Sequence, residues 1–338
     1  MRKYLLPEKG RFYKANLHCH STLSDGRLTP AEIKAAYKEK GYSVVAFTDH
    51  WVMHDQSALC DDTFVALNGY EINLTDKAFI SDDVPSKKTY HLNFIAKNPR
   101  VTAQVGFNPD AVWGKAKDYI PFVCYVGGIF DYSEYSAEAV NRMISDGNKN
   151  GFIVNYNPPA WSLQTPSEYM SQDGLFGVEV VNGVSTVDGY NDENSVIYAQ
   201  MLRRDKSLVP IAADDNHNAF GIEGDRADSF IGFNMIKAER LDYESVTEAL
   251  LRGDTYASSG PEIHELYIEN GVLHIKTSPV RRIVVDSLGR SNICIQRRDG
   301  STVTECEIPL DEKIKCFRVE ITDKNGDRAY TRLYDNLS

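Results

Sequence analysis

The sequence lacks the cysteine pattern of a secreted, disulfide-bonded domain. Its 338 residues contain six cysteines, which are scattered and form no C-x-x-C pair. Small secreted domains instead carry densely spaced cysteines, and disulfides are rare in the cytosol. We therefore expect reduced thiols.

The sequence also lacks an excess of positive charge and any long apolar run. The formal net charge is -11 at pH 7, whereas a protein that binds nucleic-acid backbones usually presents a basic face. The first residues, MRKYLLPEKGRFYK, contain no apolar stretch typical of a signal peptide, and no window is long enough to span a membrane. We expect a cytoplasmic protein with neither nucleic acid nor a membrane as a general partner. The oligomeric state is left open.

What the sequence does contain is an alternation of apolar, β-branched runs with helical patterns, which predicts βα units and a largely parallel sheet. The first helix is marked by TPAEIKAAYKEKG, in which Thr29 can cap the helix and Glu32 can complete a capping box. Further helical patterns lie at 137–149, 191–204 and 243–252. The candidate strands are seven runs: 12–20, 42–50, 63–74, 90–97, 151–159, 176–183 and 208–217.

The pattern changes near residue 260. Beyond GDTYASSGP the chain shows short strands separated by the turn pairs NG, DG and NG. We expect an α/β unit over 1–260 and a small antiparallel, β-sandwich-like domain over 261–338. Residues 98–133 do not fit the alternation, and they form either a lid that shapes the substrate site or an extra helix packed on the α/β unit.

Residues able to bind a metal fall at or near the ends of these runs. His18 and His20 are two apart on a predicted strand, so both imidazoles lie on one face. An H-x-H pair alone is common, and a lone buried histidine is usually a hydrogen-bonded core residue. The ends of parallel strands converge at one mouth of an α/β barrel, however. The further candidates there are Asp25, His50, Glu71, His91, Asp215 and His217, whereas His54, His264 and His274 are interpreted as surface or packing residues.

With these residues in place, the sequence resembles the PHP family, the polymerase and histidinol phosphatase superfamily of metal-dependent phosphoesterases. The matching segments span residues 14–217, and a softer match near 246–271 resembles stand-alone members with a C-terminal β domain. The resemblance implies a distorted (β/α)7 barrel and two or three divalent ions, commonly Mn, Zn or Fe. The segments are NLHCHSTLSDGRLTPAEI, GYSVVAFTDH, GYEINL, YHLNFIA, VEVVNG and ADDNH.

Carried over residue by residue, the resemblance assigns three metal positions. One ion would be held by His18, His20, Glu71 and Asp215, a second by Asp25, His50 and His217, and a third by His91 with Glu71 as the bridge.

The chain departs from the family at one ligand of the third ion. Where the family has a histidine, this chain reads NYNPPAW, with Asn157 followed by Pro158. An asparagine oxygen is a weak ligand and proline offers none, so the third ion should bind weakly or be absent.

The resemblance favours hydrolysis of a small phosphorylated metabolite, either a phosphomonoester or a nucleotide phosphodiester. A water bridging two divalent ions can ionise near neutral pH and attack phosphorus. Arg226, Ser258 and Ser259 are candidate phosphate contacts. Two alternatives stay open: a catalytically degenerate metal-binding or interaction module, and a hydrolase of another bond such as an amide.

Overall fold

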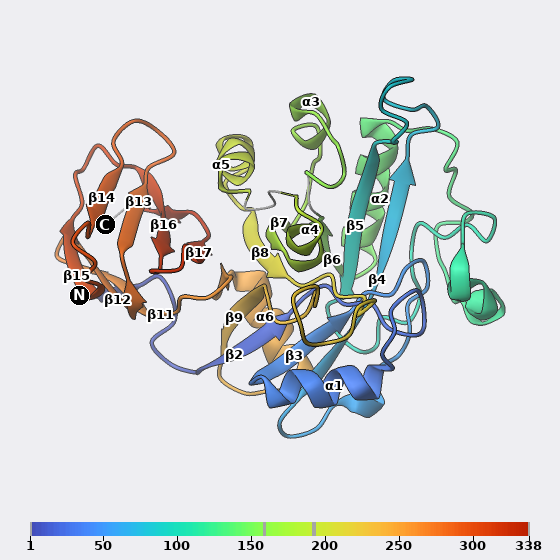
Figure 1. The fold of residues 1–338 in the computed structure, drawn as a ribbon, viewed down its shortest axis with the longest axis horizontal. Coiled ribbons are helices and arrows are strands. Elements are labelled where there is room, and N and C mark those ends of the chain that lie inside the picture. The colour runs from blue at the N-terminus through green and yellow to red at the C-terminus, as the bar shows by residue number, and fades with distance from the viewer. Residues whose placement is uncertain (1, 158–159, 191–193, 337–338) are drawn as a thin grey trace.

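The fold consists of two β-sheets with helices packed around the larger one (Figure 1). The computed structural model describes residues 2–157, 160–190 and 194–336. The large sheet follows the order β14-β13-β16-β17-β10-β9-β2-β3-β4-β5-β6-β7-β8, with β18 paired to β16 off this path. The small sheet has the order β1-β11-β12-β15. The chain is therefore a mixed α/β protein with a second, antiparallel sheet.

Each of the seven predicted runs contains a strand, but the sheet is less parallel than expected. β5 runs antiparallel to both β4 and β6, while the pairs on either side are parallel. No helix lies between β4 and β5. A chain that returns without a helical crossover pairs antiparallel with the strand it has just left. The strands are β2 (Arg11–Asn16), β3 (Tyr42–Phe47), β4 (Val65–Thr75), β5 (Thr89–Ala96), β6 (Phe152–Tyr156), β7 (Gly177–Asn182) and β8 (Val209–Ala213).

The expected barrel is not closed by a ladder among the described strands. β2 pairs antiparallel with β9 (Phe233–Ala238), and β8 has a ladder only with β7. Beyond β2 and β8, an isolated bridge joins Cys19 and Asn216. There the amide of His20 donates to the carbonyl of Asn216 at 3.1 Å, and the amide of Asp215 donates to the carbonyl of His18 at 3.0 Å. This bridge brings two predicted ligand segments, about 200 residues apart in sequence, side by side.

The helices begin close to where the sequence predicts them. Thr29 caps α1 (Pro30–Glu39) and forms the capping box with Glu32. The predicted helix at 191–204 is observed as α5 (Ser195–Arg204), and its first three residues lie outside the described ranges. The others are α2 (Ala137–Lys149), α3 (Pro166–Tyr169), α4 (Gly183–Val187), α6 (Tyr243–Arg252), and the 3-10 helices η1 (Ser57–Leu59) and η2 (Gly114–Phe122).

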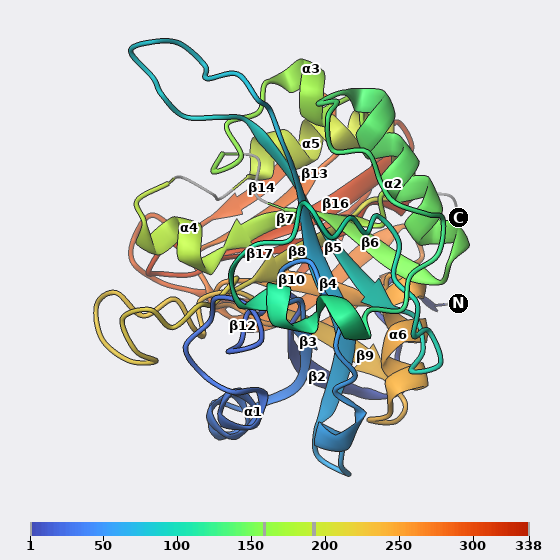
Figure 2. The same ribbon diagram turned by 90° about the vertical axis from the view of Figure 1, so that its right-hand side faces the viewer.

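Residues 98–133 pack on the main core rather than projecting from it. Val105, Phe107, Val112 and Ala116 are buried in the same cluster as the side chains of β4 to β8. The segment contains the 3-10 helix η2, which is the teal-green coil near the centre of Figure 2, and no α-helix. Residues 117–133 are exposed or half-buried, so a lid and a packed extra helix both stay predictions for this segment.

The C-terminal part is antiparallel β structure, as the turn pairs predict. Leu266, Ile275, Val285 and Phe317 are buried in a core of their own. The N-terminal strand β1 joins this part, and β17 pairs with β10, so the boundary at 260/261 stays a prediction. The strands are β1 (Arg2–Tyr4), β10 (Thr255–Ser258), β11 (Ile263–Glu269), β12 (Val272–Val280), β13 (Arg282–Asp286), β14 (Ile293–Gln296), β15 (Val303–Pro309), β16 (Cys316–Thr322), β17 (Arg328–Thr331) and β18 (Tyr334–Asp335).

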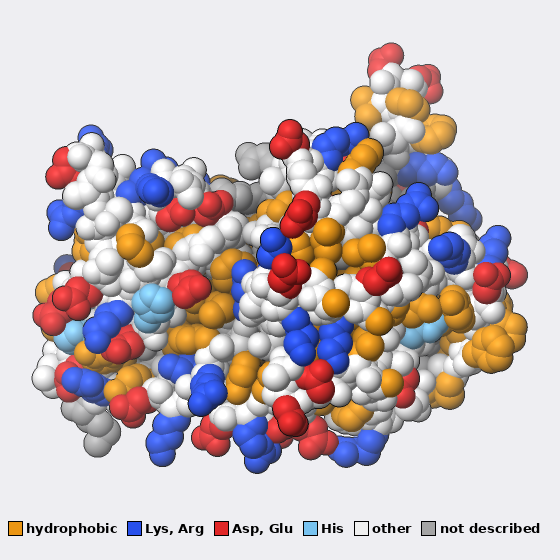
Figure 3. Space-filling view, turned by 60° about the horizontal axis from the view of Figure 1, so that its bottom comes forward, with side chains coloured by type: hydrophobic (Ala, Val, Ile, Leu, Met, Phe, Trp, Pro, Cys, Tyr) orange, Lys and Arg blue, Asp and Glu red, His pale blue; other side chains and the backbone are white. Residues whose placement is uncertain are grey.

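Three further observations concern the cysteines, the helices and the charged side chains. All six cysteines are free. None of the helices in the described ranges has the length and apolarity needed to cross a bilayer. Basic and acidic side chains are interspersed over the face shown in Figure 3.

Candidate metal centre

Four predicted ligands meet just beyond the ends of β2 and β8, facing Glu71 inside β4. The Nε2 atoms of His18 and His20 lie 3.0 Å apart, and each is 3.0 Å from Oδ1 of Asp215. Oε2 of Glu71 lies 3.6 Å from Nε2 of His18 and 3.3 Å from Nε2 of His20. These four side chains form a group that could hold one metal ion. They are the residues that the resemblance assigns to the first ion.

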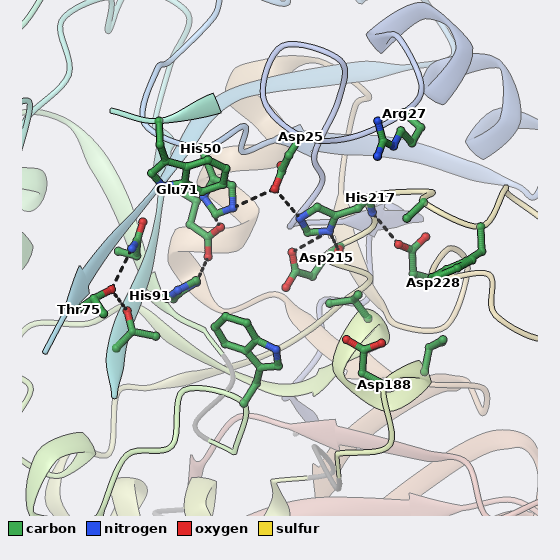
Figure 4. A pocket seen from close by; sticks show the side chains of 18 of the residues that line it. Asp25, Arg27, His50, Glu71, Thr75, His91, Asp188, Asp215, His217 and Asp228 are labelled. Atoms are coloured by element: carbon green, nitrogen blue, oxygen red, sulfur yellow. Dashed lines mark hydrogen bonds and ion pairs between the residues drawn. The ribbon is translucent and has the colours of Figure 1, made fainter. Parts of the chain in front are cut away.

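A second group adjoins the first and shares His20 with it. Oδ2 of Asp25 lies 3.8 Å from Nε2 of His50 and 3.5 Å from Nε2 of His217, as Figure 4 shows. The ring of His217 stacks on that of His20 with centroids 4.2 Å apart. The three residues predicted for the second ion are thus together, and the structure adds His20 as a fourth member.

The donor set fits divalent cations. Nδ1 of His20, Nδ1 of His50 and Oδ1 of Asp215 are buried without a hydrogen-bond partner. Buried polar atoms are rarely left unpaired, and imidazole and carboxylate ligands together suit ions such as Zn, Mn or Fe. These clusters can therefore bind metal ions, whose identity and number stay predictions.

The backbone also supports this interpretation. Asp215 has φ of 52°, in the left-handed region that is unusual for a residue other than glycine. Unusual backbone conformations of this kind concentrate at functional sites. The amide of Asp215 is anchored on the carbonyl of His18, so this conformation is held by the same bridge that joins the two ligand segments.

The electrostatics of the cluster favour positive charge between the carboxylates. Burial alone would lower the pKa of His20, but close contacts with the carboxylates of Asp215 and Glu71 outweigh it and raise that pKa to about 10. Burial would raise the pKa of Glu71, yet neighbouring imidazoles, including His91 and His50, lower it well below its usual value. His50 itself is buried enough to lower its pKa to about 3. A bound cation would supply the positive charge that the carboxylates attract here.

The third predicted position is less complete than the other two. Nδ1 of His91 lies 2.8 Å from Oε1 of Glu71, and Nδ2 of Asn157 donates to the same oxygen at 2.5 Å. The side-chain oxygen of Asn157 is buried and has no hydrogen-bond partner. Among the described His, Cys, Asp and Glu residues, only the first two groups bring enough ligands together. Asn157 therefore occupies the predicted place beside Glu71.

Glu179 is a site residue that the sequence reasoning missed. Its Oε1 lies 2.7 Å from Nδ1 of His18, and its Oε2 accepts a hydrogen bond from Asn182 at 2.9 Å. A carboxylate on one ring nitrogen fixes the tautomer and turns the other nitrogen toward the metal. The signal was available, because Glu179 is the one charged residue in the buried strand GVEVVN.

Two further carboxylates hold the ligand loops. Asp228 accepts hydrogen bonds from the amides of His217 at 2.7 Å and of Asn218 at about 3 Å. Asp49 accepts hydrogen bonds from the amide of Ser21 and from the hydroxyl of Ser24, the residue before Asp25. Asp49 is the aspartate of FTDH, to which the sequence reasoning gave no role.

The ligand groups open into a cavity of about 680 Å³. Arg226 lies on its wall, where the guanidinium stacks 3.4 Å from the ring centroid of Phe220. Ser258 and Ser259 are not among the residues that line this cavity. The hydroxyl of Ser258 donates to the carbonyl of Pro261, and Ser259 exchanges hydrogen bonds with the backbone of Arg328. The structure therefore places Ser258 at the end of β10 and Ser259 just after it, outside the lining of this cavity.

The remaining histidines lie outside both ligand groups. His54 packs edge-on against Tyr119, and His274 stacks on Tyr267. His264 has a half-exposed side chain. Their positions agree with the expected surface and packing roles.

The fold and the site define an α/β protein with adjoining groups of metal-binding side chains at one end of the sheet. Residues 16–107 match the PHP domain family, which confirms the resemblance drawn from the sequence. Over 92 residues the chain is 35% identical to a 5'-3' exoribonuclease of Haemophilus influenzae. The match covers 27% of this chain and 32% of that relative's length.

Solved structures give weaker likenesses. A two-domain protein from Bacteroides vulgatus, described as containing a predicted PHP-like metal-dependent phosphoesterase, is 16% identical over 98% of both chains, with a TM-score of 0.47. An amidohydrolase from Chromobacterium violaceum is also 16% identical, over 60% of this chain and 87% of its own, with a TM-score of 0.38. At these scores neither structure carries an argument about this chain's chemistry.

Proposed function

We propose that the protein is a metal-dependent phosphoesterase that hydrolyses a small phosphorylated metabolite. The observation that carries the proposal is the pair of adjoining ligand groups, joined through His20, at the wall of a cavity large enough for such a ligand. The match of residues 16–107 to the PHP domain supports it.

Three cationic side chains line the cavity together with carboxylates such as Asp188 and Asp228, and a phosphate ester would meet both. The cations are Arg27, Lys87 and Arg226, although the whole chain is acidic. These cations would orient the phosphoryl group and offset its charge. When bound, divalent ions would supply the acidity that activates a water near neutral pH.

The chain's own residues define where the reaction takes place. His18, His20, Glu71 and Asp215 would hold one ion, and His20, Asp25, His50 and His217 the other. Glu179 fixes the ring of His18, while Asp228 and Asp49 fix the ligand loops. The phosphoryl group would then lie at the ligand cluster, in the cavity that Arg27, Lys87 and Arg226 also line.

The proposal is tested with protein dialysed against a chelator and reloaded separately with Mn, Zn or Fe. We expect hydrolysis of phosphomonoesters or phosphodiesters only in the reloaded samples, and competitive inhibition by inorganic phosphate. His20→Ala should abolish turnover, whereas His264→Ala, which alters a half-exposed histidine of β11 outside both ligand groups, should retain it. Full activity in the presence of the chelator would contradict the proposal.

A catalytically degenerate metal-binding module is the second candidate, and Asn157 is the observation that favours it. The family has a histidine at this position, whereas here the side-chain amide of Asn157 donates a hydrogen bond to Oε1 of Glu71. Protein that binds Mn but hydrolyses no phosphate ester in a broad panel would favour this candidate. Amide hydrolysis without inhibition by phosphate would instead indicate a hydrolase of another bond.

A further inference from the structure

Two tryptophans on the cavity wall are not explained by metal binding. Trp113 lies in the 98–133 segment just before η2, and Trp161 lies between β6 and α3. Both line the cavity, and they remain 38% and 36% exposed. Burying a large aromatic side chain is worth about 2 kcal/mol, so two indoles left open to one cavity are an unusual use of apolar surface.

Each tryptophan packs against a histidine at the edge of the ligand cluster. The ring centroid of Trp113 is 4.8 Å from that of His50, and the centroid of Trp161 is 5.0 Å from that of His91. The ring centroids of His50 and His91 are themselves 6.2 Å apart, and the two ring planes are nearly perpendicular. The indoles therefore flank neighbouring parts of the cluster, close to where a phosphoryl group would lie.

The rest of the wall is arranged so that apolar and polar groups are both available. Val184 and Val187 of α4 add aliphatic surface, whereas Thr75 and Thr89, whose hydroxyls are hydrogen-bonded to each other, add polar surface. The volume of about 680 Å³ lies within the range of sites for small organic ligands. A phosphate group alone would leave most of this space unfilled, so the pocket also has room for the group to which the phosphate is esterified.

We propose that Trp113 and Trp161 are specificity-determining residues that receive a flat aromatic ring in the leaving group of the substrate. This inference rests on the proposed function, because it takes the phosphoryl group to lie at the ligand cluster. An indole offers a π-face to a flat ring, and such stacking adds to simple apolar burial. Hydrolysis would consume one water and break the P–O bond, giving the aromatic alcohol and the phosphate product.

The test compares two substrates that differ only in the ring. 2-Phenylethyl phosphate and 2-cyclohexylethyl phosphate have leaving alcohols of similar basicity and size, so a difference in kcat/KM reports recognition of a flat ring. We expect the manganese-loaded protein to prefer the phenyl ester by about tenfold, as stacking on one aromatic side chain allows. The corresponding methyl phosphodiesters test the same preference if the protein hydrolyses only diesters.

Variants assign the preference to the two tryptophans. Trp113→Leu and Trp161→Leu keep apolar bulk but remove the aromatic face, and each should reduce the preference severalfold, while Trp113→Phe and Trp161→Phe should retain most of it. Phe122→Ala is the control, because Phe122 lies in η2, is 82% exposed and does not line the cavity. Circular dichroism verifies that each variant is folded.

A binding measurement separates the inference from the proposed function. Calorimetry with 2-phenylethylphosphonate and its cyclohexyl counterpart, which cannot be hydrolysed at the P–C bond, measures ring recognition without turnover. Preferential binding of the phenyl compound with no ester hydrolysis would support the aromatic site and contradict the esterase proposal. Hydrolysis of both esters at equal kcat/KM, with equal binding of both phosphonates, would overturn the inference and leave the esterase proposal standing. Loaded protein that neither binds nor hydrolyses any of these compounds would overturn both.

Discussion

Glu179 contacts the candidate metal centre through its hydrogen bond to Nδ1 of His18. We predict that Glu179→Gln lowers metal affinity by about tenfold or more, because an amide no longer polarises and fixes the imidazole as a carboxylate does. Competition with a fluorescent chelator measures the change. Glu223→Gln is the matched control, since that side chain is 77% exposed. Equal affinities in the two variants would show that Glu179 has no role in tuning His18.

Asn157 lies beside Glu71, where the sequence predicts an additional ion. Its amide lies against Glu71, on the same oxygen as His91. We predict that Asn157→His raises the metal content by up to one ion per chain, because an imidazole would complete the position shared by Glu71 and His91. Elemental analysis after gel filtration gives the metal content of both proteins. An unchanged metal content in folded Asn157→His protein would contradict the prediction.

At the scale of elements, the turn between β2 and α1 carries Asp25 and has little room to move. A Cβ on Gly26 would lie 2.5 Å from the carbonyl oxygen of His20. We predict that Gly26→Ala shifts this turn, costs about 1–3 kcal/mol of stability and weakens binding of the ion that Asp25 would hold. Calorimetric metal titration and thermal unfolding measure both effects. Gly289→Ala, where a Cβ would meet ordinary contacts, should change neither.

The strands could be predicted because the signal is local, although β2, β3 and β8 end before the ligands that follow them, and Glu71 lies inside β4. Apolar runs identify buried strands, and metal-capable residues at their ends identify the site, so the eight charged or imidazole candidates from His18 to His217 are brought together in the structure. The direction of β5 could not be predicted in the same way, because pairing depends on how the chain returns after β4 rather than on the composition of either strand.

Other parts of the site depend on contacts between distant residues. Glu179 looked like a strand residue, and its role appears only when His18, 161 positions away, is placed beside it. Ser258 and Ser259 looked available because hydroxyls are common phosphate contacts, yet Ser258 bonds to the carbonyl of Pro261 and Ser259 to the backbone of Arg328. Sequence spacing therefore identified the ligands better than it identified the residues that support them.

At the scale of the whole molecule, Arg318 connects α5 to the C-terminal strands. Its side chain is 3% exposed, lies 2.9 Å from a carboxylate oxygen of Asp286, and donates to the hydroxyl of Ser195 at 3.0 Å. We predict that Arg318→Met destabilises the protein by about 3 kcal/mol, because it leaves the partly buried carboxylate of Asp286 without its cationic partner. Chemical denaturation measures the loss, and the exposed Arg298→Met is the control. A loss equal to that of the control would contradict the prediction.

The pairing of β1 with β11 has a consequence for how the protein is made. Arg2 lies opposite Glu269, and Tyr4 lies opposite Tyr267. During synthesis β1 leaves the ribosome before its partner β11, which emerges only after more than 260 further residues have been translated. The pairing of these two strands therefore cannot form until β11 has been made. By then the segments that carry the candidate metal ligands have already emerged.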